Sequence, residues 1–393
     1  MSDIVENIVI VGGGPVGATL ALLLAKQGVA VTVLEARQQK AAYTESRALA
    51  LSYGSKRILE KLSVWGSLAT SATAINTIHV SQKGSLGRSK LQAHDYKQEA
   101  LGYVLSYGKL SEALDAALAS QPLVNFVFEA SAEHIAHTYA HASVTYCHQG
   151  NSQTLNSHLV VLADGGRSLD EIAGLVKETK EYGHDALISK VRAELPHNNI
   201  AYERFTANGP MALLPNGASQ NSNDFSLVWT GKKEYINTLL ALSDAEFLAQ
   251  FHEQFGDRVG QFLSVEKRMA FPLKLSQLKT TETPHLVVIG NAAQTMHPVA
   301  GQGFNVGLRD AESLAQTIAT TAPADFGNQK MLDEYLASRQ SDTKNGLLFT
   351  DFLVNIFSND IVGVNGLRSA GLGLFDMIKP IKQHLVSKMS YGK

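Results

Sequence analysis

The feature that most constrains the fold is a glycine-rich turn, Gly12-Gly13-Gly14-Pro15-Val16-Gly17. Before it, Ile8 to Val11 is a run of β-branched residues, which predicts a short strand buried on both faces. After it, Ala18 to Gln27 is rich in Ala and Leu at helical spacing, and Gly28 marks the end of that helix. Residues 30–35 predict a second strand, so the segment is typical of a strand–helix–strand unit with parallel strands.

Each glycine of the GxGxxG pattern has its own task in a nucleotide-binding turn. Gly12 permits the tight turn, Gly14 lets the backbone approach a pyrophosphate, and Gly17 allows close helix–strand packing. The helix N-terminus offers free N–H groups to the phosphates. Glu35, at the end of the second strand, can accept hydrogen bonds from ribose hydroxyls and would repel a 2′-phosphate. These features predict a dinucleotide site; the alternative is a purely structural turn.

Composition excludes several other classes of protein. Because 34 Lys and Arg balance 36 Asp and Glu, the net charge of -2 provides no field for nucleic acid. The single Cys147 excludes an intrachain disulfide or a CxxC redox pair. The histidines between His134 and His148 lack carboxylate spacing, so no metal site is expected. No apolar run approaches the roughly 18–20 residues that span a bilayer, and the N-terminus is acidic, unlike a secretory signal, so we expect a cytoplasmic protein.

The rest of the chain predicts an α/β fold: a discontinuous Rossmann-like domain with an inserted mixed β-sheet domain of α+β type. Helices are expected over 50–62 and 109–120, and the insert contains a helix opened by the capping box Ser243-Asp244-Ala245-Glu246. A buried strand at 286–289 returns the chain to the first domain. The predicted boundaries are 1–72, 98–180 and 272–350 for the Rossmann-like domain, 73–97 and 181–271 for the insert, and 351–393 for a C-terminal helical segment.

Two further glycine-bearing segments follow strand-like runs. The first is Ala163-Asp164-Gly165-Gly166-Arg167-Ser168, and the second runs from Gly290 to Asn305, with Gly301 and Gly303 at the predicted start of a helix. Both are expected at the carboxyl ends of strands, where open α/β sheets bind ligands. Because a domain that binds NAD alone needs neither segment, and no second GxGxxG occurs, they favour FAD over NAD.

The three motifs together resemble those of the class A FAD-dependent aromatic hydroxylases, which combine a GxGxxG turn, an Asp-Gly motif and a Gly-Asp motif. Within that class, longer segments resemble the ubiquinone-biosynthesis hydroxylases, and 290–294 is similar to the branch acting on 2-polyprenyl-6-methoxyphenol. The resemblance runs from about residue 7 to about residue 350. Its longer matching segments are Tyr202 to Thr206, Gly209 to Pro215, Ser226 to Trp229, His297 to Asn305 and Arg339 to Asp342.

The resemblance implies an enzyme that hydroxylates the ring of 2-polyprenyl-6-methoxyphenol in ubiquinone biosynthesis. It implies FAD as cofactor, O2 as co-substrate, and NAD(P)H or another reductant as electron source. In this family a C4a-hydroperoxyflavin attacks the electron-rich ring while the protein excludes water. The implied partners are the polyprenylated phenol, other ubiquinone-biosynthesis proteins and a second copy of the chain. Hydroxylation of another phenol, a flavin oxidase or dehydrogenase, and a non-catalytic FAD-stabilised subunit stay open as alternatives.

The resemblance also assigns cofactor residues. Arg47 is implied near the isoalloxazine and pyrophosphate, its alternative being a surface arginine, and Lys109 is implied to face the cofactor from a helix start. Asn291 replaces the family's Asp at the ribityl chain, where its oxygen can still accept a hydrogen bond. The complete cofactor set is Gly12, Gly14, Pro15, Val16, Gly17, Glu35, Ala36, Arg47, Lys109, Asp164, Gly165, Gly290, Asn291, Pro298, Gly301, Gln302, Gly303, Phe304 and Asn305.

Catalytic and substrate residues are implied on both predicted domains. Arg204 could orient a phenolate or methoxy oxygen, or form a salt bridge between strands. Trp229 and Met211 could wall an aromatic pocket, although core packing is the favoured interpretation. No residue is identifiable as the base that deprotonates the phenol. The catalytic set is Arg47, His297, Pro298 and Arg204, and the substrate set is Tyr202, Arg204, Met211 and Trp229.

Two regions leave questions open. Glu171 stands where the family's Asp-Gly motif ends in an arginine linked with pyridine-nucleotide contact, so the electron donor is undecided. The tail over 360–393 mixes apolar residues with lysines and several glycines. Contact with a subunit or partner is the favoured interpretation of this tail, and peripheral contact with a membrane surface is the alternative.

Overall fold

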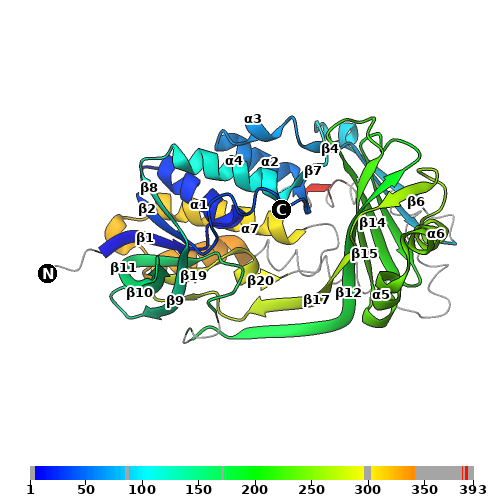
Figure 1. Ribbon diagram of the computed structural model, residues 1–393. Coiled ribbons are helices and arrows are strands. Elements are labelled where there is room, and N and C mark those ends of the chain that lie inside the picture. The colour runs from blue at the N-terminus through cyan, green and yellow to red at the C-terminus, as the bar shows by residue number, and fades with distance from the viewer. Residues whose placement is uncertain are drawn as a thin grey trace.

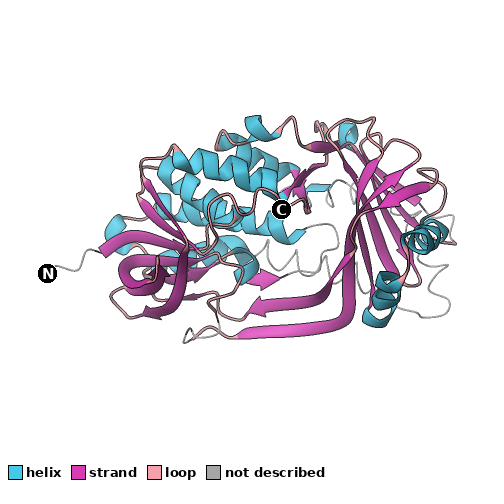
Figure 2. Cartoon of the chain, viewed as in Figure 1, coloured by secondary structure: helices cyan, strands magenta, loops and turns pink. Residues whose placement is uncertain are grey.

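The computed structural model describes residues 5–84, 88–169, 172, 174–295, 302–340, 383 and 386–387. Within them, the chain forms two large sheets side by side, with a small three-stranded sheet between them (Figures 1 and 2). The labelled helices are α1 (Pro15–Lys26), α2 (Tyr53–Lys61), α3 (Trp65–Leu68), α4 (Tyr107–Ala119), α5 (Lys233–Ala241), α6 (Asp244–Phe255) and α7 (Gln302–Ala319), with 3-10 turns η1 (Ala93–Tyr96), η2 (Gly290–Ala292) and η4 (Pro323–Asp325). Residues 329–340 are helical as well.

The first sheet has the strand order β18-β19-β11-β1-β2-β8, with β10 and β9 paired beyond β11. Strand β1 runs parallel to β2 on one side and to β11 on the other, so their carboxyl ends meet at one edge. The strands are β1 (Val5–Val11), β2 (Val31–Glu35), β8 (Val124–Phe128), β9 (Ala130–His137), β10 (Ala142–His148), β11 (Asn151–Leu162), β18 (Glu282–Thr283) and β19 (Leu286–Val288).

Strand β1 is buried on both faces, as its β-branched run predicts. Ile8 and Ile10 pack with Leu20 and other residues of the layer formed by α1, α4 and α7. Val9 belongs to a second core on the opposite face, which includes Val144 of β10. Each fully buried aliphatic side chain of this kind contributes roughly 1.5–3 kcal/mol. The helix layer and the β9–β10 side therefore hold the end of β1 rigidly between them.

The second sheet has the order β20-β17-β12-β15-β14-β13-β5-β6, with β16 paired to β12. Helices α5 and α6 cover one face of it (Figure 1). Helix α6 begins with the predicted capping box, since Ser243 accepts from the Glu246 N–H and Glu246 from the Ser243 N–H. The strands are β5 (Thr77–Gln82), β6 (Arg88–Gln92), β12 (Lys177–Ala193), β13 (Ile200–Thr206), β14 (Gly209–Asn216), β15 (Asp224–Lys232), β16 (Phe262–Val265), β17 (Met269–Leu278) and β20 (Gln294–Thr295).

The long strands β12 and β17 connect the two halves. They pair from Lys177 and Leu278 at one end to Ile188 and Met269 at the other, with an irregularity between Glu181 and Asp185. Figure 1 shows β12 extending beneath the first half and bending into the second sheet. Both strands run through the predicted boundaries near 180 and 271, so the two halves share continuous strands. The domain boundaries themselves stay a prediction.

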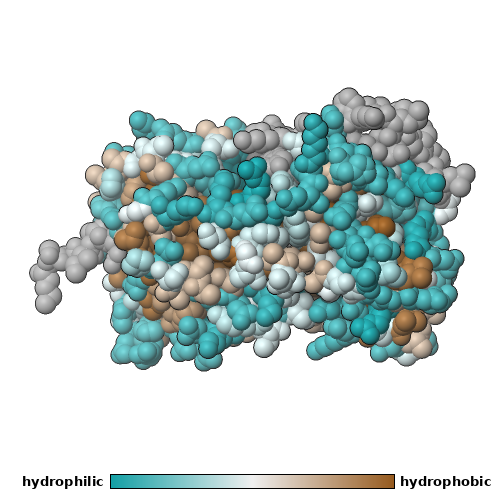
Figure 3. All heavy atoms as spheres, turned by 90° about the horizontal axis from the view of Figure 1, so that it is seen from above, coloured by the Kyte–Doolittle hydropathy of each residue, from teal (hydrophilic) through white to brown (hydrophobic). Residues whose placement is uncertain are grey.

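The small sheet consists of β3 (Ala48–Ser52), β7 (Gly102–Ser106) and β4 (Thr73–Ile75), and it corrects one prediction. The helix expected from residue 50 begins only at Tyr53, because Asn305 of α7 donates to the Ala50 carbonyl and accepts from the Ser52 N–H, holding this segment as strand. The surface seen from above is hydrophilic at its edges, with hydrophobic side chains gathered in its left half and in a smaller group at the right (Figure 3).

Candidate functional site

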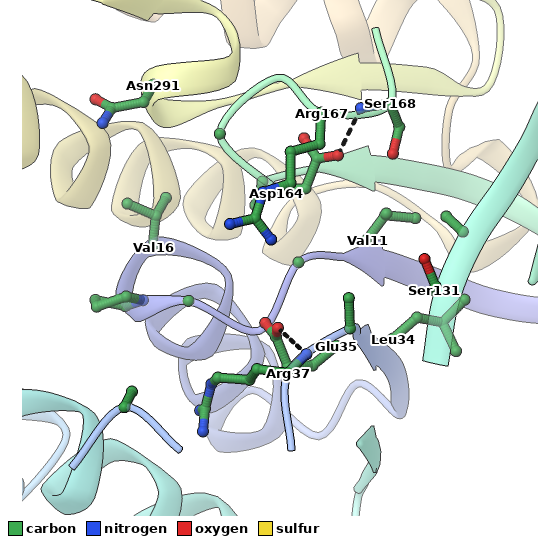
Figure 4. A pocket seen from close by; sticks show the side chains of 18 of the residues that line it. Val11, Val16, Leu34, Glu35, Arg37, Ser131, Asp164, Arg167, Ser168 and Asn291 are labelled. Carbon is green, nitrogen blue, oxygen red and sulfur yellow. Dashed lines mark hydrogen bonds between the residues drawn. The ribbon is translucent and has the colours of Figure 1, made fainter. Parts of the chain in front are cut away.

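A cavity of about 930 Å³ opens where β1, β2 and β11 end. This is the edge at which open α/β sheets bind ligands. The loops after the three strands line it, together with β9 and residues of η2 and α7 (Figure 4). The predicted cofactor residues that line it are Gly12, Gly14, Pro15, Val16, Glu35, Ala36, Arg47, Asp164, Gly165, Asn291 and Phe304.

The geometry of the glycine turn matches the three tasks expected of it. Gly12 has a φ of +102°, and a Cβ there would lie 2.6 Å from the backbone of Asp164. A Cβ on Gly17 would collide with the Gly12 carbonyl oxygen, so this glycine allows the helix to approach the turn. A Cβ on Gly14 would meet only the Tyr107 hydroxyl, at 3.8 Å, and Gly14 lines the cavity. The space beside Gly14 is therefore open to a ligand and is not filled by other protein atoms.

The N-terminus of α1 fits the pyrophosphate of FAD. Its N-cap is Gly14, no side chain caps it, and its first turn has no acidic residue. Pro15 occupies the first turn, where a missing N–H costs nothing. The remaining N–H groups of that turn need a partner from outside the helix, and the helix dipole favours an anion there. The residues present thus match the charge and the hydrogen-bonding needs of a diphosphate.

Glu35 has a structural role in addition to the ribose contact that the sequence predicts. Its side chain is 7% exposed. One carboxylate oxygen accepts from the Gly13 N–H at 2.6 Å and the other from the Arg37 N–H at 2.8 Å. Each oxygen keeps a second lone pair, so the carboxylate can still accept from a ribose hydroxyl. Glu35 therefore also anchors the glycine turn to the end of β2.

Asp164 shapes the loop after β11. Its two oxygens accept from the Gly166 and Ser168 N–H groups, each at 2.8 Å. Gly165 and Gly166 both have positive φ, which folds the loop back beside the glycine turn. Arg167 lies in the cavity wall beside Asp164 (Figure 4) and is absent from the predicted set, although it sits inside the Asp-Gly segment.

Besides Arg167, two further arginines line the cavity, Arg37 and Arg47, and the protein holds the first more firmly than the second. Arg37, which the sequence reasoning missed, contacts Asp115 at 2.7 Å and lies over the Phe128 ring at 5.2 Å. Burial opposes its charge, but the hydrogen bond and the charge of Asp115 outweigh that and raise the pKa of Arg37. Arg47 is exposed, pairs with Glu45 at 2.9 Å and lies over the Tyr107 ring at 4.9 Å. It lines the cavity wall, as the implied cofactor role requires.

Lys109 does not face the cavity, which corrects its implied role. Its ammonium group pairs with Glu112 at 2.9 Å on the exposed side of α4. Tyr107 is the residue of this helix start that lines the cavity. Two residues along an α-helix turn the side chain by about 200°, so Lys109 points the other way.

The Gly290 segment reaches the cavity through Asn291 and Phe304. The Gly290 N–H donates to Asp310, which in turn pairs with Arg339 at 2.7 Å. Gly290 has a φ of +66°, and a Cβ there would press on Val16 of the glycine turn. These contacts hold the segment against the first motif.

Asn305 is a structural residue, which corrects its predicted cofactor role. It is 2% exposed, and it accepts from Ser52 and Ser55 and donates to Ala50. His297, Pro298 and Gly301 lie outside the described residues, as does the side chain of Gln302. A Cβ on Gly303 would lie 3.6 Å from the Asn291 side-chain oxygen, beside the cavity.

The four predicted substrate residues lie on the helix-covered face of the second sheet. Trp229 and Met211 are 0% exposed and belong to a core with Phe247 and Phe251 of α6. Both residues thus pack in the core, as the favoured interpretation predicts. Tyr202 packs against the same core.

Arg204 lies on that face too, where its guanidinium donates to the Gln254 carbonyl and to the Ser81 hydroxyl. Burial, and after it the charge of Arg258, lowers the pKa of Arg204 to about 10. Arg204 therefore forms hydrogen bonds beneath α6, in place of the expected substrate contact or salt bridge between strands. Side chains alternate between faces along a strand, and the helices α5 and α6 decide which face becomes core.

Fold and cavity together define a Rossmann-type FAD-binding flavoprotein with a second, mixed sheet, in which β5 and β13 are the parallel pair. The chain belongs to the FAD-binding domain family, whose model matches residues 6–346, and it is an FAD-dependent monooxygenase. It is 35% identical to the ubiquinone hydroxylase UbiL of Rhodospirillum rubrum, covering 97% of this chain and 89% of that protein. It is 28% identical to the 3-demethoxyubiquinol 3-hydroxylase of Escherichia coli, covering 95% of each.

A solved structure of the same fold is that of p-nitrophenol 4-monooxygenase PnpA from Pseudomonas putida. It matches with a TM-score of 0.77 at 17% identity, over 99% of this chain and 98% of that one. At this identity the match establishes the shared fold, and the predicted α/β fold class is confirmed.

Proposed function

We propose that this monooxygenase hydroxylates the aromatic ring of a polyprenylated phenol in ubiquinone biosynthesis, with 2-polyprenyl-6-methoxyphenol as its substrate. The observation that carries the proposal is the similarity to a ubiquinone hydroxylase at 35% identity over 97% of the chain. The motif resemblance at 290–294 supports the particular phenol. The cavity at the ends of β1, β2 and β11 supports the flavin chemistry that ring hydroxylation needs.

The residues of the cavity have defined tasks toward FAD. When bound, FAD supplies the redox chemistry that activates O2. The N–H groups at the start of α1 neutralise the pyrophosphate, and Glu35 accepts from a ribose hydroxyl. Asn291, which lines the cavity from η2, offers an amide to the ribityl chain. Arg47, in the cavity wall, provides positive charge for the reduced, anionic ring.

The proposed substrate carries a lipid tail, so the enzyme must reach it at or near a membrane. No helix among the described residues is long and apolar enough to cross a membrane. We propose a cytoplasmic enzyme that takes its substrate by peripheral contact at the membrane and works with other ubiquinone-biosynthesis proteins or a second copy. The segment 360–393, on which the sequence expectation of such contacts rests, lies outside the described residues except 383 and 386–387. NAD(P)H is the proposed electron donor.

Lipid analysis of a deletion strain tests this function. A ubiquinone-producing bacterium that lacks the gene should accumulate 2-polyprenyl-6-methoxyphenol and lose ubiquinone. Return of the chain should restore ubiquinone, whereas the Gly14→Ala chain should not. Mass spectrometry of the extract identifies the accumulated phenol and the ring position that stays unmodified. Normal ubiquinone without a precursor would contradict the proposal, and a different accumulated phenol would replace the substrate named here.

A further inference from the structure

The second sheet has a face opposite α5 and α6, which we call the open face. It is defined by Ile188, Val228, Ala212, Glu203 and Val80, one residue from each of β12, β15, β14, β13 and β5. All five residues are partly exposed, whereas Trp229 and Met211 on the other face are fully buried. In Figure 1 the open face lies toward the first half of the molecule.

These five residues form one row across the sheet. Ile188 pairs with Val228, Val228 with Ala212, Ala212 with Glu203, and Glu203 with Val80. Four of them are apolar, so Glu203 is the one ionisable residue of the row. Placing a charged carboxyl group among apolar side chains costs desolvation energy unless a hydrogen bond or an opposite charge compensates it.

No described residue compensates that cost. No hydrogen bond or ion pair to the Glu203 carboxyl occurs among the described residues. Its neighbours on the open face are Ala201 and Phe205 on β13, Ala212 on β14, and Ile78 and Val80 on β5, none of which is titratable. Burial alone raises the pKa of Glu203 to about 8. A perturbed carboxyl of this kind is typical of functional sites.

The open face reaches the part of the molecule that holds the cavity. Ala201 lies two residues before Glu203 on β13, on the same face of the sheet. It packs with Ile75 of β4 and Val104 of β7. Ala48 of β3 packs against the same cluster. Its neighbours Arg47 and Leu49 line the nucleotide cavity. The contacts therefore run from the strand of Glu203 through the small sheet to the cavity wall.

We propose that Glu203 is a catalytic residue that accepts the proton of the phenolic hydroxyl while the aromatic substrate lies against the open face. The inference rests on the proposed function and supplies the base that the sequence left unidentified. In the step, the phenol O–H bond breaks and an O–H bond forms on the carboxylate. The negative charge moves from Glu203 to the phenol oxygen, which activates the ring positions ortho and para to it toward an electrophilic oxygen. The apolar row would contact the ring and its prenyl substituent.

The chemistry suits this residue because a general base works best when its pKa lies near the operating pH. An ordinary glutamate, with a pKa of about 4.3, is too weak to take a proton from a phenol with a pKa of about 10. A carboxyl whose pKa lies between these two values reduces the difference in pKa between base and phenol. It can also return the proton when the product leaves.

A single-turnover measurement with Glu203→Gln tests the proposal. The FAD-loaded protein is photoreduced, which bypasses the electron donor, and mixed with O2 and 2-methoxy-6-prenylphenol. We expect the rate constant of hydroxylation at pH 7 to fall about 10²–10⁴-fold, the usual contribution of a general base, while FAD stays bound. The pH dependence near 8 should disappear. The control is Glu282→Gln, another partly buried glutamate whose pKa burial raises, at the far edge of the first sheet.

The ultraviolet spectrum of the bound phenol provides a second readout, since phenolate absorbs at longer wavelength than phenol. Because a carboxylate beside the phenol disfavours a second negative charge, bound phenolate should appear at a higher pH in the unmodified chain than in Glu203→Gln. An unchanged rate constant and an unchanged pH profile in Glu203→Gln would overturn the inference and leave the proposed function intact. If the variant loses FAD, the unmodified chain decides: a single-turnover hydroxylation rate that shows no inflection near pH 8 would overturn the inference. If the unmodified chain consumes O2 without hydroxylating the probe, the proposed function falls and the inference with it.

Discussion

The two large sheets use their side chains in opposite ways. The first is built around parallel strands buried on both faces, so it offers a ligand only its carboxyl edge, where the cavity lies. In the second, the antiparallel strands β13, β14 and β15 have one face packed under α5 and α6 and one partly exposed. In the first half the loops at the sheet edge therefore form the cavity, whereas in the second half a strand face stays partly exposed.

Removal of Trp229 should have the largest effect on stability and little effect on chemistry. Its ring lies 5.7 Å from that of Phe251 and 6.1 Å from that of Phe247, with no exposure. We expect Trp229→Ala to lower the free energy of unfolding by about 3–5 kcal/mol. Chemical denaturation measures the loss. A raised KM for the phenol with unchanged stability would show instead that this face binds substrate.

Gly14→Ala should separate cofactor binding from folding. The backbone of Gly14, with φ of -62° and ψ of 177°, suits any residue, and its new methyl group would project into the cavity. We expect FAD affinity to fall roughly tenfold or more, a loss of about 1.4 kcal/mol or above, with apoprotein stability nearly unchanged. Flavin absorbance after gel filtration measures it.

Gly28→Ala is the matched control for Gly14→Ala. Gly28 has a φ of +81° and no atom within 4 Å of the added Cβ. It should lose about 1 kcal/mol of stability and keep FAD. Equal FAD loss in both variants would contradict the assignment of the glycine turn.

Glu203→Gln should make the protein more stable at alkaline pH. Because the folded pKa of Glu203, about 8, lies above its unfolded value, the folded state holds the proton more tightly. Stability from this group is therefore full below the unfolded pKa and is lost as pH rises toward 8 and through it. The variant removes that loss, so its melting temperature should exceed that of the unmodified chain at pH 9 and match it near pH 4. The same difference at both pH values would contradict the buried position of the carboxyl.

Lys109→Ala should have the smallest effect. Its ion pair with Glu112 is exposed, and such pairs contribute about 0–1 kcal/mol. We expect FAD affinity to stay the same in a fluorescence titration. A loss comparable to that of Arg47→Ala would contradict the orientation of α4 described here.

Local patterns brought together residues that line the cavity, because these residues belong to one contiguous unit. Gly12, Gly14 and Glu35 belong to one strand–helix–strand unit whose spacing alone brings them to one edge. The lining residues that reasoning missed, such as Arg37 and Ser131, come from positions that only strand pairing brings near. The pairing of β8 beside β2, with β9 following it, carries Ser131 to the cavity, and no motif marks it.

The second half shows where pattern reasoning ends. Alternation along β13 correctly separates Tyr202 and Arg204 from their neighbours, but it does not tell which set faces outward. Helices α5 and α6 decide this by covering one face, and α7 likewise converts residues near Ala50 from a predicted helix to a strand through Asn305. In both cases a distant segment overrides the local preference.

By itself, the sequence determined the nucleotide-binding unit and the capped helix α6, since each depends on residues close together in the chain. It also indicated the flavin class, through three motifs that are each short and contiguous. Only the tertiary structure decided which sheet face is core, that Lys109 turns away from the cavity, and that Glu203 stands in an apolar row facing the cofactor half. The physical reason is that a strand has two faces, each formed by alternate residues. Which of them is desolvated depends on what packs there from elsewhere in the chain.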